Sequence, residues 1–555
     1  MKVKSTFALA LLAVASGALS SCGSSAELQF WSSFGTAYTS VLNGIIEKAG
    51  QATGTTFDHN PTGSYDKVKS EMMSAIADSS YPDLVTGYPD HFAEYLGNDI
   101  LQPLDKYVKA YDEANGTNLL EDYFPAYMEE NYSLAVDDEG NKVLSALPFN
   151  KSTELMGYNG VFVDYCATID PDLKQVPATW QEWEVKGPKY REILTDLAGG
   201  KKALYGVQNE EGTASQFNLQ AKRIDKKDAN GNYVDNDNKP LLLDFTDVDV
   251  DLTRVISWDS TDNMFITLVR QWGGQYTRLD AEQMKQEPLY RKGDILFNAK
   301  NDKQYGDVRS KVVDCMRFFK KLNKDHIFGV PKEFQQSYSS KAFELNQVMF
   351  MLCSSGGLSY NTAKWTNRFR VAPLPYNAAL GNDGKYVISQ GANITLTDRN
   401  QADPDKSQKA FNAMVAMTTG SLQAEWCLNT GYYPCSKSAT DDPAYQAFLA
   451  STDYTFPTTV AYREGANINQ KEYMDTNKGW HKFVDPAFIG SSDIRTLVKT
   501  VFESTFIKIV VNDSGEEGTY PTVDAVPDSV FEAILAGVVN DPTIKQKAQN
   551  INVVA

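Results

Sequence analysis

The sequence predicts an α/β fold built around a largely parallel sheet. Short apolar segments typical of strands alternate with segments whose apolar residues recur at helical spacing, most clearly in residues 27–86. Alternation of this kind is typical of layered α/β proteins. The composition agrees, because 42% of the 555 residues are apolar and 22% are charged, as in ordinary globular proteins. Disordered, collagen-like and coiled-coil classes are therefore disfavoured.

Five elements open the chain after residue 26. In order, we expect a strand at 27–31, a helix over 41–49 ended by Gly54, a strand starting at 55–57, a helix over 68–76 and a strand at 82–86. Ligands of such sheets bind in the loops at the carboxyl ends of the strands. A site is therefore expected in the loops 31–34, 62–66 and 87–90.

The middle of the chain is less regular. Thr179 followed by Glu182 is a capping box, which predicts a helix start at Trp180. Residues 225–240 are polar and turn-rich and partly match a calcium-binding loop, but Lys226 stands at the first ligand position, where a cation opposes calcium. An exposed loop or hairpin is the preferred interpretation, and no metal site is predicted.

The first 22 residues have the pattern of a bacterial export signal. Lys2 and Lys4 precede an apolar stretch at 7–15 that is too short to span a bilayer. Small residues then lead to Cys22, in an arrangement that resembles the lipobox of bacterial lipoproteins. Cys22 is therefore predicted to carry the lipid, and the alternative is an ordinary signal peptide cut nearby. We expect a protein anchored outside a bacterial cytoplasmic compartment through lipid alone.

The net charge and the absence of catalytic motifs disfavour several classes of function, and the cysteines allow at most one local disulfide pair to be suggested. The net charge of −18 opposes sequence-independent nucleic-acid binding, which needs a basic face. No sequence motif of a nucleophile elbow, zinc protease, P-loop or dinucleotide site occurs, which lowers the expectation of an enzyme. Cys427 and Cys435 are candidates for a local disulfide, and buried free thiols are the equal alternative.

A set of short motifs resembles the family 1 extracellular solute-binding proteins, the capture subunits of carbohydrate-type ABC importers. The first motif is Pro148-Phe149-Asn150-Lys151-Ser152-Thr153, followed by Gly157-Tyr158-Asn159. The others follow in the family's order at 353–358, 369–376, 390–393, 430–434 and 492–495. Each motif alone is weak, whereas the ordered set covers most of residues 27 to 510.

The resemblance is greatest to the glycerol-3-phosphate-binding branch of that family. It implies a ligand site made of Tyr65, Ser152, Ser354, Ser355, Gly391, Tyr432 and Arg495. The arginine offers a fork of donors for a phosphate, and serine hydroxyls and glycine turns add donors. Where the branch has a glutamate directly after a tyrosine, this chain has Tyr88-Pro89-Asp90, so Asp90 is expected to replace it. No cofactor is implied.

The resemblance also implies a two-lobed periplasmic-binding-protein fold of type II, with lobes joined by a multi-crossover hinge. Residues 27–149 plus 372–432 would form the N-terminal lobe and 154–369 plus 434–555 the C-terminal lobe, with crossings near Asn150, Arg370 and Tyr433. The implied function is hinge-closing capture of a carbohydrate or glycerol-phosphate-type solute by a monomer, for delivery to ABC permease subunits. The alternatives are a surface lipoprotein enzyme acting on glycans or glycerophosphodiesters, and a scaffolding lipoprotein.

Overall fold

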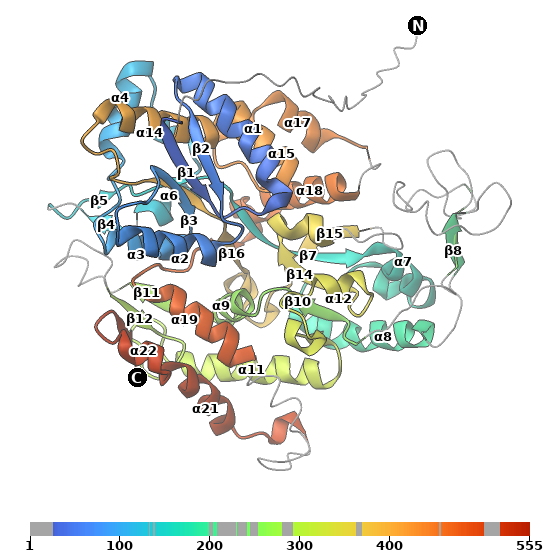
Figure 1. The fold of residues 1–555 in the computed structure, drawn as a ribbon. Helices are drawn as coiled ribbons and strands as arrows, with labels where there is room; N and C mark the ends of the chain where they lie inside the picture. Colours follow the sequence, from blue (N-terminus) through green and yellow to red (C-terminus); the bar gives the residue numbers. More distant parts are fainter. Residues whose placement is uncertain are drawn as a thin grey trace, which may run out of the picture.

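A computed structural model of the protein shows two lobes, each built on its own mixed sheet (Figure 1). The N-terminal lobe is here the part packed on a five-stranded sheet, and the C-terminal lobe is the part packed on a seven-stranded sheet. The structure describes residues 26–132, 134–136, 139–198, 204–207, 229, 241–244, 253–279, 292–361, 369–453, 457–503 and 522–554. The signal segment with Cys22, and the turn-rich 225–240 apart from residue 229, lie outside these ranges.

The sheet of the N-terminal lobe begins as the sequence predicts and then departs from it. Its strands, in spatial order, are β2 (Phe57–Pro61), β1 (Leu28–Ser32), β3 (Leu84–Gly87), β17 (Asn393–Leu396) and β6 (Leu147–Pro148). β1 runs parallel to β2 and β3, whereas β17 is antiparallel to both β3 and β6. Four of the five strands therefore run in the same direction, in agreement with the predicted largely parallel sheet, and β17 alone runs the opposite way, because it enters this sheet from the other lobe.

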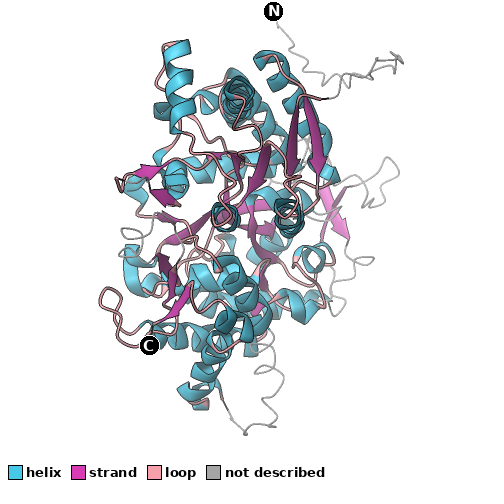
Figure 2. Cartoon of the chain, turned by 60° about the vertical axis from the view of Figure 1, so that its left-hand side comes forward, coloured by secondary structure: helices cyan, strands magenta, loops and turns pink. Residues whose placement is uncertain are grey.

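Helices cover both faces of this sheet (Figures 1 and 2). Leu84 and Val85 are neighbours on β3 and point to opposite faces, so they belong to two separate apolar cores. The Leu84 core is closed by α1 (Thr36–Thr53), α14 (Pro404–Thr418) and α15 (Gly420–Thr430), and the Val85 core by α2 (Tyr65–Ile76) and α3 (Pro89–Leu96). Further described helices of this lobe are α4 (Asp105–Asn115), α5 (Leu119–Asp122), α6 (Pro125–Tyr132), α16 (Lys437–Thr440) and α17 (Pro443–Ala450).

The C-terminal lobe is organised around β7 (Ser152–Asn159), which pairs antiparallel with three strands. These are β14 (Phe350–Ser354), β15 (Phe369–Pro373) and β16 (Tyr386–Gln390), and the sheet continues through β10 (Ile256–Trp258), β13 (Phe328–Gly329) and β18 (His481–Phe483). A small sheet joins β11 (Thr277–Leu279), β12 (Gly293–Ile295) and β19 (Ile551–Val553). Two-stranded pieces are β4 (Ala135–Val136) with β5 (Lys142–Val143) and β8 (Leu204–Val207) with β9 (Leu241–Asp244).

Helices with buried aromatic side chains pack on the sheet of the C-terminal lobe. α8 (Trp180–Ala198) starts at the predicted capping box, where the Glu182 amide donates to Thr179 Oγ1 at 3.1 Å, and it buries Trp180 and Trp183 completely. The other described helices are α7 (Gly160–Ile169), α9 (Thr261–Gln271), α11 (Val308–Lys324), α12 (Ser340–Glu344), α13 (Leu358–Asn361), α18 (Pro457–Ile468), α19 (Ser491–Leu497), α21 (Asp528–Val539) and α22 (Pro542–Gln546).

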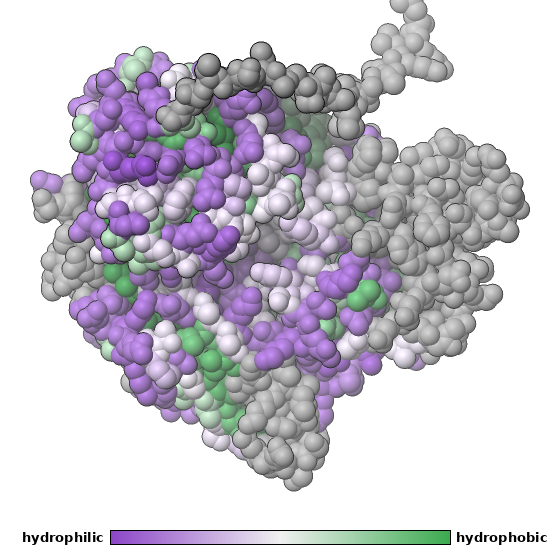
Figure 3. Space-filling view, viewed as in Figure 1, coloured by the Kyte–Doolittle hydropathy of each residue, from purple (hydrophilic) through white to green (hydrophobic). Residues whose placement is uncertain are grey.

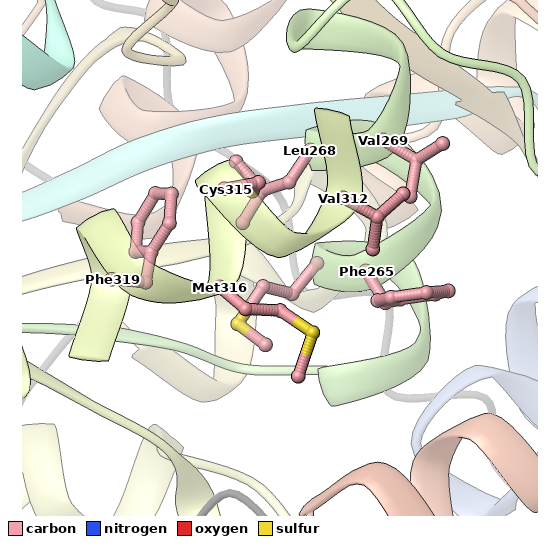
Figure 4. A pocket seen from close by; sticks show the side chains of 8 residues that line it. Phe265, Leu268, Val269, Val312, Cys315, Met316 and Phe319 are labelled. Carbon is pink, nitrogen blue, oxygen red and sulfur yellow. The ribbon is translucent and has the colours of Figure 1, made fainter. Parts of the chain in front are cut away.

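One small void lies inside this core, between α9 and α11 (Figure 4). Its eight lining side chains are all apolar or thiol, among them Phe265, Met316 and Phe319, and its volume is about 20 Å³. A space of that size holds little more than one water, and the lining offers no hydrogen-bond partners. The void is a packing gap and not a binding site.

The chain passes between the two sheets three times, and two of these passages, here called the crossing segments, are neighbours. One runs from β6 to β7 through Asn150, and the other runs from β16 to β17 through Gly391. They lie side by side, since the Asn150 amide donates to the Ala392 carbonyl at 3.1 Å. Gly391 has a φ of +106°, and a Cβ there would lie 1.7 Å from the Asn150 carbonyl oxygen. Only glycine fits this contact between the crossing segments.

The lobe boundaries differ from the predicted ones in two places. β16, predicted for the N-terminal lobe, pairs with β7 in the other sheet, so the chain does not change lobes near Arg370. Residues 434–450 were predicted for the C-terminal lobe. Their side chains Cys435 and Tyr445 are instead buried in the core of the N-terminal lobe. Sequence motifs mark these segments but do not show which sheet they join.

Two further features bear on the predictions. All five cysteines after Cys22 are buried free thiols, so Cys427 and Cys435 form no disulfide. Within the described ranges, no helix combines the length and the apolar character needed to cross a bilayer.

The crossing at Gly391 generates a prediction about stability. Gly391→Ala should destabilise the protein by ~3 kcal/mol or more, because it adds both a steric clash and a strained backbone. Gly54→Ala is the matched control, since Gly54 also has a positive φ but has nothing within 4 Å of an added Cβ, and it should cost only about 1 kcal/mol. Urea unfolding measures both. Equal losses in the two variants would contradict the tight crossing.

Candidate functional site

A cavity of about 40 Å³ lies between the lobes beside the two crossing segments. Figure 3 shows the surrounding surface, which is mainly hydrophilic and is hollowed between the two lobes. The N-terminal lobe contributes Tyr88, Pro89, Asp90 and Glu130, and the C-terminal side contributes Ile388, Ser389, Gln390, Gly391, Val484, Asp485, Pro486, Ser491 and Arg495. Because both lobes contribute lining residues, the shape of the cavity depends on how the lobes are placed relative to each other.

Arg495 on α19 is the main cation of this cavity and is already paired. Its Nε donates to Asp262 Oδ2 at 2.7 Å, and its guanidinium also bonds the side chain of Asn263. Burial opposes the charge, but Asp262, Asp485 and Asp90 together hold the pKa of Arg495 above its usual value. The arginine therefore stands among three carboxylates rather than in a basic pocket.

Asp485, just after β18, is the most perturbed carboxylate that lines the cavity. Burial raises its pKa to about 7, and the nearby Arg495 offsets only part of that effect. Thr277 Oγ1 donates to Asp485 Oδ1 at 3.2 Å. Asp485 is thus close to half-protonated at neutral pH, so its carboxyl group can either donate to or accept from a hydroxyl.

Tyrosines connect this cavity to the crossing segment. Tyr65, the first residue of α2, has its hydroxyl 3.2 Å from Asn150 Nδ2, which donates to it. The ring of Tyr65 lies 4.5 Å from that of Tyr88, which lines the cavity. Tyr432 interacts with Tyr65 and Tyr88, and burial raises the pKa of all three phenols. The three tyrosines therefore form one cluster, here called the aromatic or tyrosine wall, of which Tyr88 lines the cavity.

The predicted serines lie at the carboxyl end of β14 and the start of β7. Ser354 Oγ donates to Ser152 Oγ at 3.2 Å and accepts from the Gly356 amide at 3.2 Å. Ser355 is fully buried. Gly356 lies against the ring of Tyr432, where an added Cβ would come within 2.7 Å of it. The serine turn of the C-terminal lobe thus abuts the aromatic wall of the N-terminal lobe.

Glu154 lies beneath this region on β7 and is only 1% exposed. Trp258 Nε1 donates to its Oε1 at 2.8 Å, while Oε2 has no hydrogen-bond partner among the described residues. Burial raises the pKa of Glu154 to about 8, with Arg495 acting in the opposite direction. The side chain is therefore largely protonated at neutral pH.

The structure brings the predicted site residues into two adjoining groups. Asp90, Gly391 and Arg495 line the cavity, whereas the second group surrounds the Tyr65–Asn150 contact and consists of Tyr65, Ser152, Ser354, Ser355 and Tyr432. The ring contact of Tyr65 with Tyr88 joins the groups.

Sequence reasoning missed several polar residues of the site. Asp262, Asp485 and Glu154 carry no motif of their own, and only the fold places them near Arg495. Gln390 lies in the motif at 390–393 but was not singled out as a site residue. Tyr88 did have a signal, because it directly follows a predicted strand, where α/β sheets place ligand contacts.

Glu154 generates a pH prediction. Its folded pKa of about 8 exceeds the unfolded value of 4.5, so the folded state holds an extra proton between those pH values. The contribution of Glu154 to wild-type stability must then fall as pH rises from 4.5 through about 8. Glu154→Gln removes this loss and should be more stable than wild type at pH 9 by ~2–4 kcal/mol, but similar at pH 5.

Urea unfolding at both pH values measures this difference, and Glu129→Gln, on an exposed position of α6, is the control. The other buried acids are present in every variant and cancel in the comparison. A Glu154→Gln effect that does not change with pH would show that Glu154 is ionised throughout.

Comparisons with known proteins agree with this architecture. Among solved structures, the fold is similar to UgpB from Mycobacterium tuberculosis in complex with glycerophosphocholine, with a TM-score of 0.58, 14% identity, and coverage of 95% of this chain and 100% of that one. It is also similar to Lmo0181 from Listeria monocytogenes in complex with cycloalternan, with a TM-score of 0.57, 12% identity, and coverage of 92% and 97%. A maltodextrin-binding domain from Bdellovibrio bacteriovorus bound to maltotriose gives a TM-score of 0.52, 15% identity, and coverage of 94% and 100%.

At these identities the likenesses establish the two-lobed periplasmic-binding-protein fold that the motifs implied. No curated protein matches the chain by sequence. The sequence profile of the bacterial extracellular solute-binding proteins does match, over residues 44–452, which is more than half of the chain. The chain therefore belongs to the bacterial extracellular solute-binding protein family.

Proposed function

We propose that this protein is the capture subunit of a bacterial ABC importer and that its solute is a neutral carbohydrate held between the lobes. The family supports solute binding, and two of the similar structures hold oligosaccharides, cycloalternan and maltotriose. The observation that carries the choice of a neutral solute is the pairing of Arg495 with Asp262, with Asp485 and Asp90 close by.

The charge balance of the cavity supports this choice. A phosphate dianion at Arg495 would have to displace Asp262 and would meet the charges of Asp90 and Asp485 in a partly desolvated space. A sugar hydroxyl meets no such repulsion, because it both donates and accepts hydrogen bonds. Ser389 Oγ and Gln390 Nε2 are buried and have no hydrogen-bond partner among the described residues, so they offer further polar contacts to a hydroxyl-rich ligand.

A glycerophosphodiester with a cationic headgroup is the second candidate. The guanidinium of Arg495 lines the cavity, and the tyrosine wall with Asp90 and Asp485 suits a quaternary ammonium. The complex of UgpB with glycerophosphocholine supports this class. Free glycerol 3-phosphate fits less well, because it has no cation to meet the carboxylates.

Capture would proceed by closure of the lobes around the solute without covalent chemistry. The lobes already touch in this structure, since the Tyr38 hydroxyl donates to the Gly356 carbonyl at 3.1 Å. On another side of the interface, Lys547 Nζ lies 3.2 Å from Glu94 Oε1. These contacts are small and polar, so closure and reopening are both accessible.

A substitution at Asp485 separates the ligand classes. Asp485→Asn should weaken maltotriose binding about tenfold, because a charged acceptor for sugar hydroxyls is lost. The same change should strengthen any binding of glycerol 3-phosphate, because a repelling charge is removed. Calorimetry with maltotriose, glycerophosphocholine and glycerol 3-phosphate measures this, with Asp58→Asn, on an exposed position of β2, as the control.

Wild-type preference for glycerol 3-phosphate over the other two solutes would overturn the neutral-carbohydrate proposal. Mass spectrometry of the same mixtures tests the enzyme alternative, because a binding protein leaves its solute intact. Absence of binding by every solute class tested would favour the scaffolding alternative.

Membrane attachment is the remaining part of the proposal, and it rests on the lipobox-like segment before Cys22. Two or more acyl chains on one cysteine give stable anchoring without a membrane-seeking surface. Cys22→Ser should therefore move the protein from the membrane fraction to the soluble extracytoplasmic fraction while leaving solute affinity unchanged. Fractionation followed by immunoblotting measures this, and a variant that stays with the membrane would contradict the lipid anchor.

A further inference from the structure

A larger cavity lies at the other side of α6, where the two lobes also meet. Its volume is about 250 Å³, and it shares no lining residue with the cavity described above. Phe124, Tyr127 and Tyr445 come from the N-terminal lobe, and Ala466, Asn469 and Met474 come from α18 and the residues after it. Within α6, Tyr127 lines this cavity while Glu130, one turn later, lines the other.

Lys482 on β18 lies directly behind the lining of this cavity and is not itself one of the lining residues. Its Nζ donates to the Tyr127 hydroxyl at 2.8 Å and to Asn469 Oδ1 at 2.9 Å, and both partners line the cavity. The ammonium also lies 4.6 Å from the centre of the Tyr127 ring. Within the described ranges, no carboxylate oxygen lies within 4.0 Å of it. All its described hydrogen-bond partners are therefore neutral, and the side chain is half-buried.

The electrostatic surroundings agree with a missing counter-charge. Burial lowers the pKa of Lys482 to about 7, and the neighbouring cation Lys151 lowers it further. Glu130 and the Cys435 thiol act in the opposite direction, but they do not restore the usual value. An anion placed beside the ammonium would stabilise its charged form.

We propose that this cavity is a second ligand site, which binds a small organic anion with an aromatic body and holds its carboxylate at Lys482. The rings of Phe124, Tyr127 and Tyr445 supply apolar contacts of the kind that a flat ring prefers. The volume is sufficient, since an engineered apolar cavity of ~150 Å³ binds benzene.

Benzoate is the probe for this site, and benzamide is its neutral counterpart. Calorimetry at pH 6.5 should show saturable benzoate binding and at least tenfold weaker binding of benzamide. Lys482→Met should weaken benzoate at least tenfold, whereas Lys471→Met, at an exposed position beside the cavity, should change it less than twofold. Benzoate affinity should fall between pH 6 and 8.5 in wild type and stay flat in Lys482→Met.

A second variant protects the test against a folding artefact at Lys482. Ala466→Leu narrows the cavity without touching any charge and should weaken both benzoate and benzamide, with an unchanged circular dichroism spectrum. No saturable benzoate binding to wild type, equal affinity for benzoate and benzamide, or unchanged benzoate affinity in both variants would each overturn the proposal. Because the expected solutes of the interlobe site are neutral or zwitterionic, failure here leaves the proposed transport function intact.

Discussion

The buried ion pair between Lys151 and Glu130 determines where the chain passes between the lobes. Lys151 is wholly buried in the first crossing segment and bonds the Glu130 carboxylate of α6 and, at 3.1 Å, the carbonyl of Gly391 in the second crossing segment. Asn393 Nδ2 donates to the same Glu130 at 2.7 Å. A buried pair of this kind is strongly destabilising when one partner is removed. The two neighbouring crossing segments are therefore fixed to α6 and to each other at one point, and the proposed closure of the lobes would take place about this point.

Charge placement then decides what the cleft can hold. The chain carries a net charge of −18, and the one arginine that lines the interlobe cavity is paired with Asp262. Neither the overall field nor the local pairing favours a free anion at this site. Hydroxyl groups meet carboxylates, a tyrosine wall and unpartnered donors there, which suits polyhydroxylated solutes. Lys482, which has no carboxylate oxygen within 4.0 Å among the described residues, lies instead on the other side of α6.

Sequence reasoning predicted the opening strands and helices because their periodicity is local. It also found the motif from Pro148 to Thr153, which coincides with the first crossing and with β7. It misassigned β16, because a strand's lobe depends on pairing with β7 more than 200 residues earlier, and no local pattern records that. Asp485 and Glu154 were missed for the same reason, because the residues around them are distant in the sequence and come together only in the folded protein. Arg495 was found through a motif, but its pairing with Asp262 spans 233 residues.

We propose that the interlobe cleft, the space around the cavity beside the crossing segments, holds a neutral, hydroxyl-rich solute without altering it. Native mass spectrometry of the protein purified from its own source, under conditions that preserve non-covalent complexes, tests this most directly. We expect one bound molecule whose released mass and fragmentation are those of an intact neutral carbohydrate. A bound phosphate monoester, or a mixture of substrate and cleavage product, would contradict it.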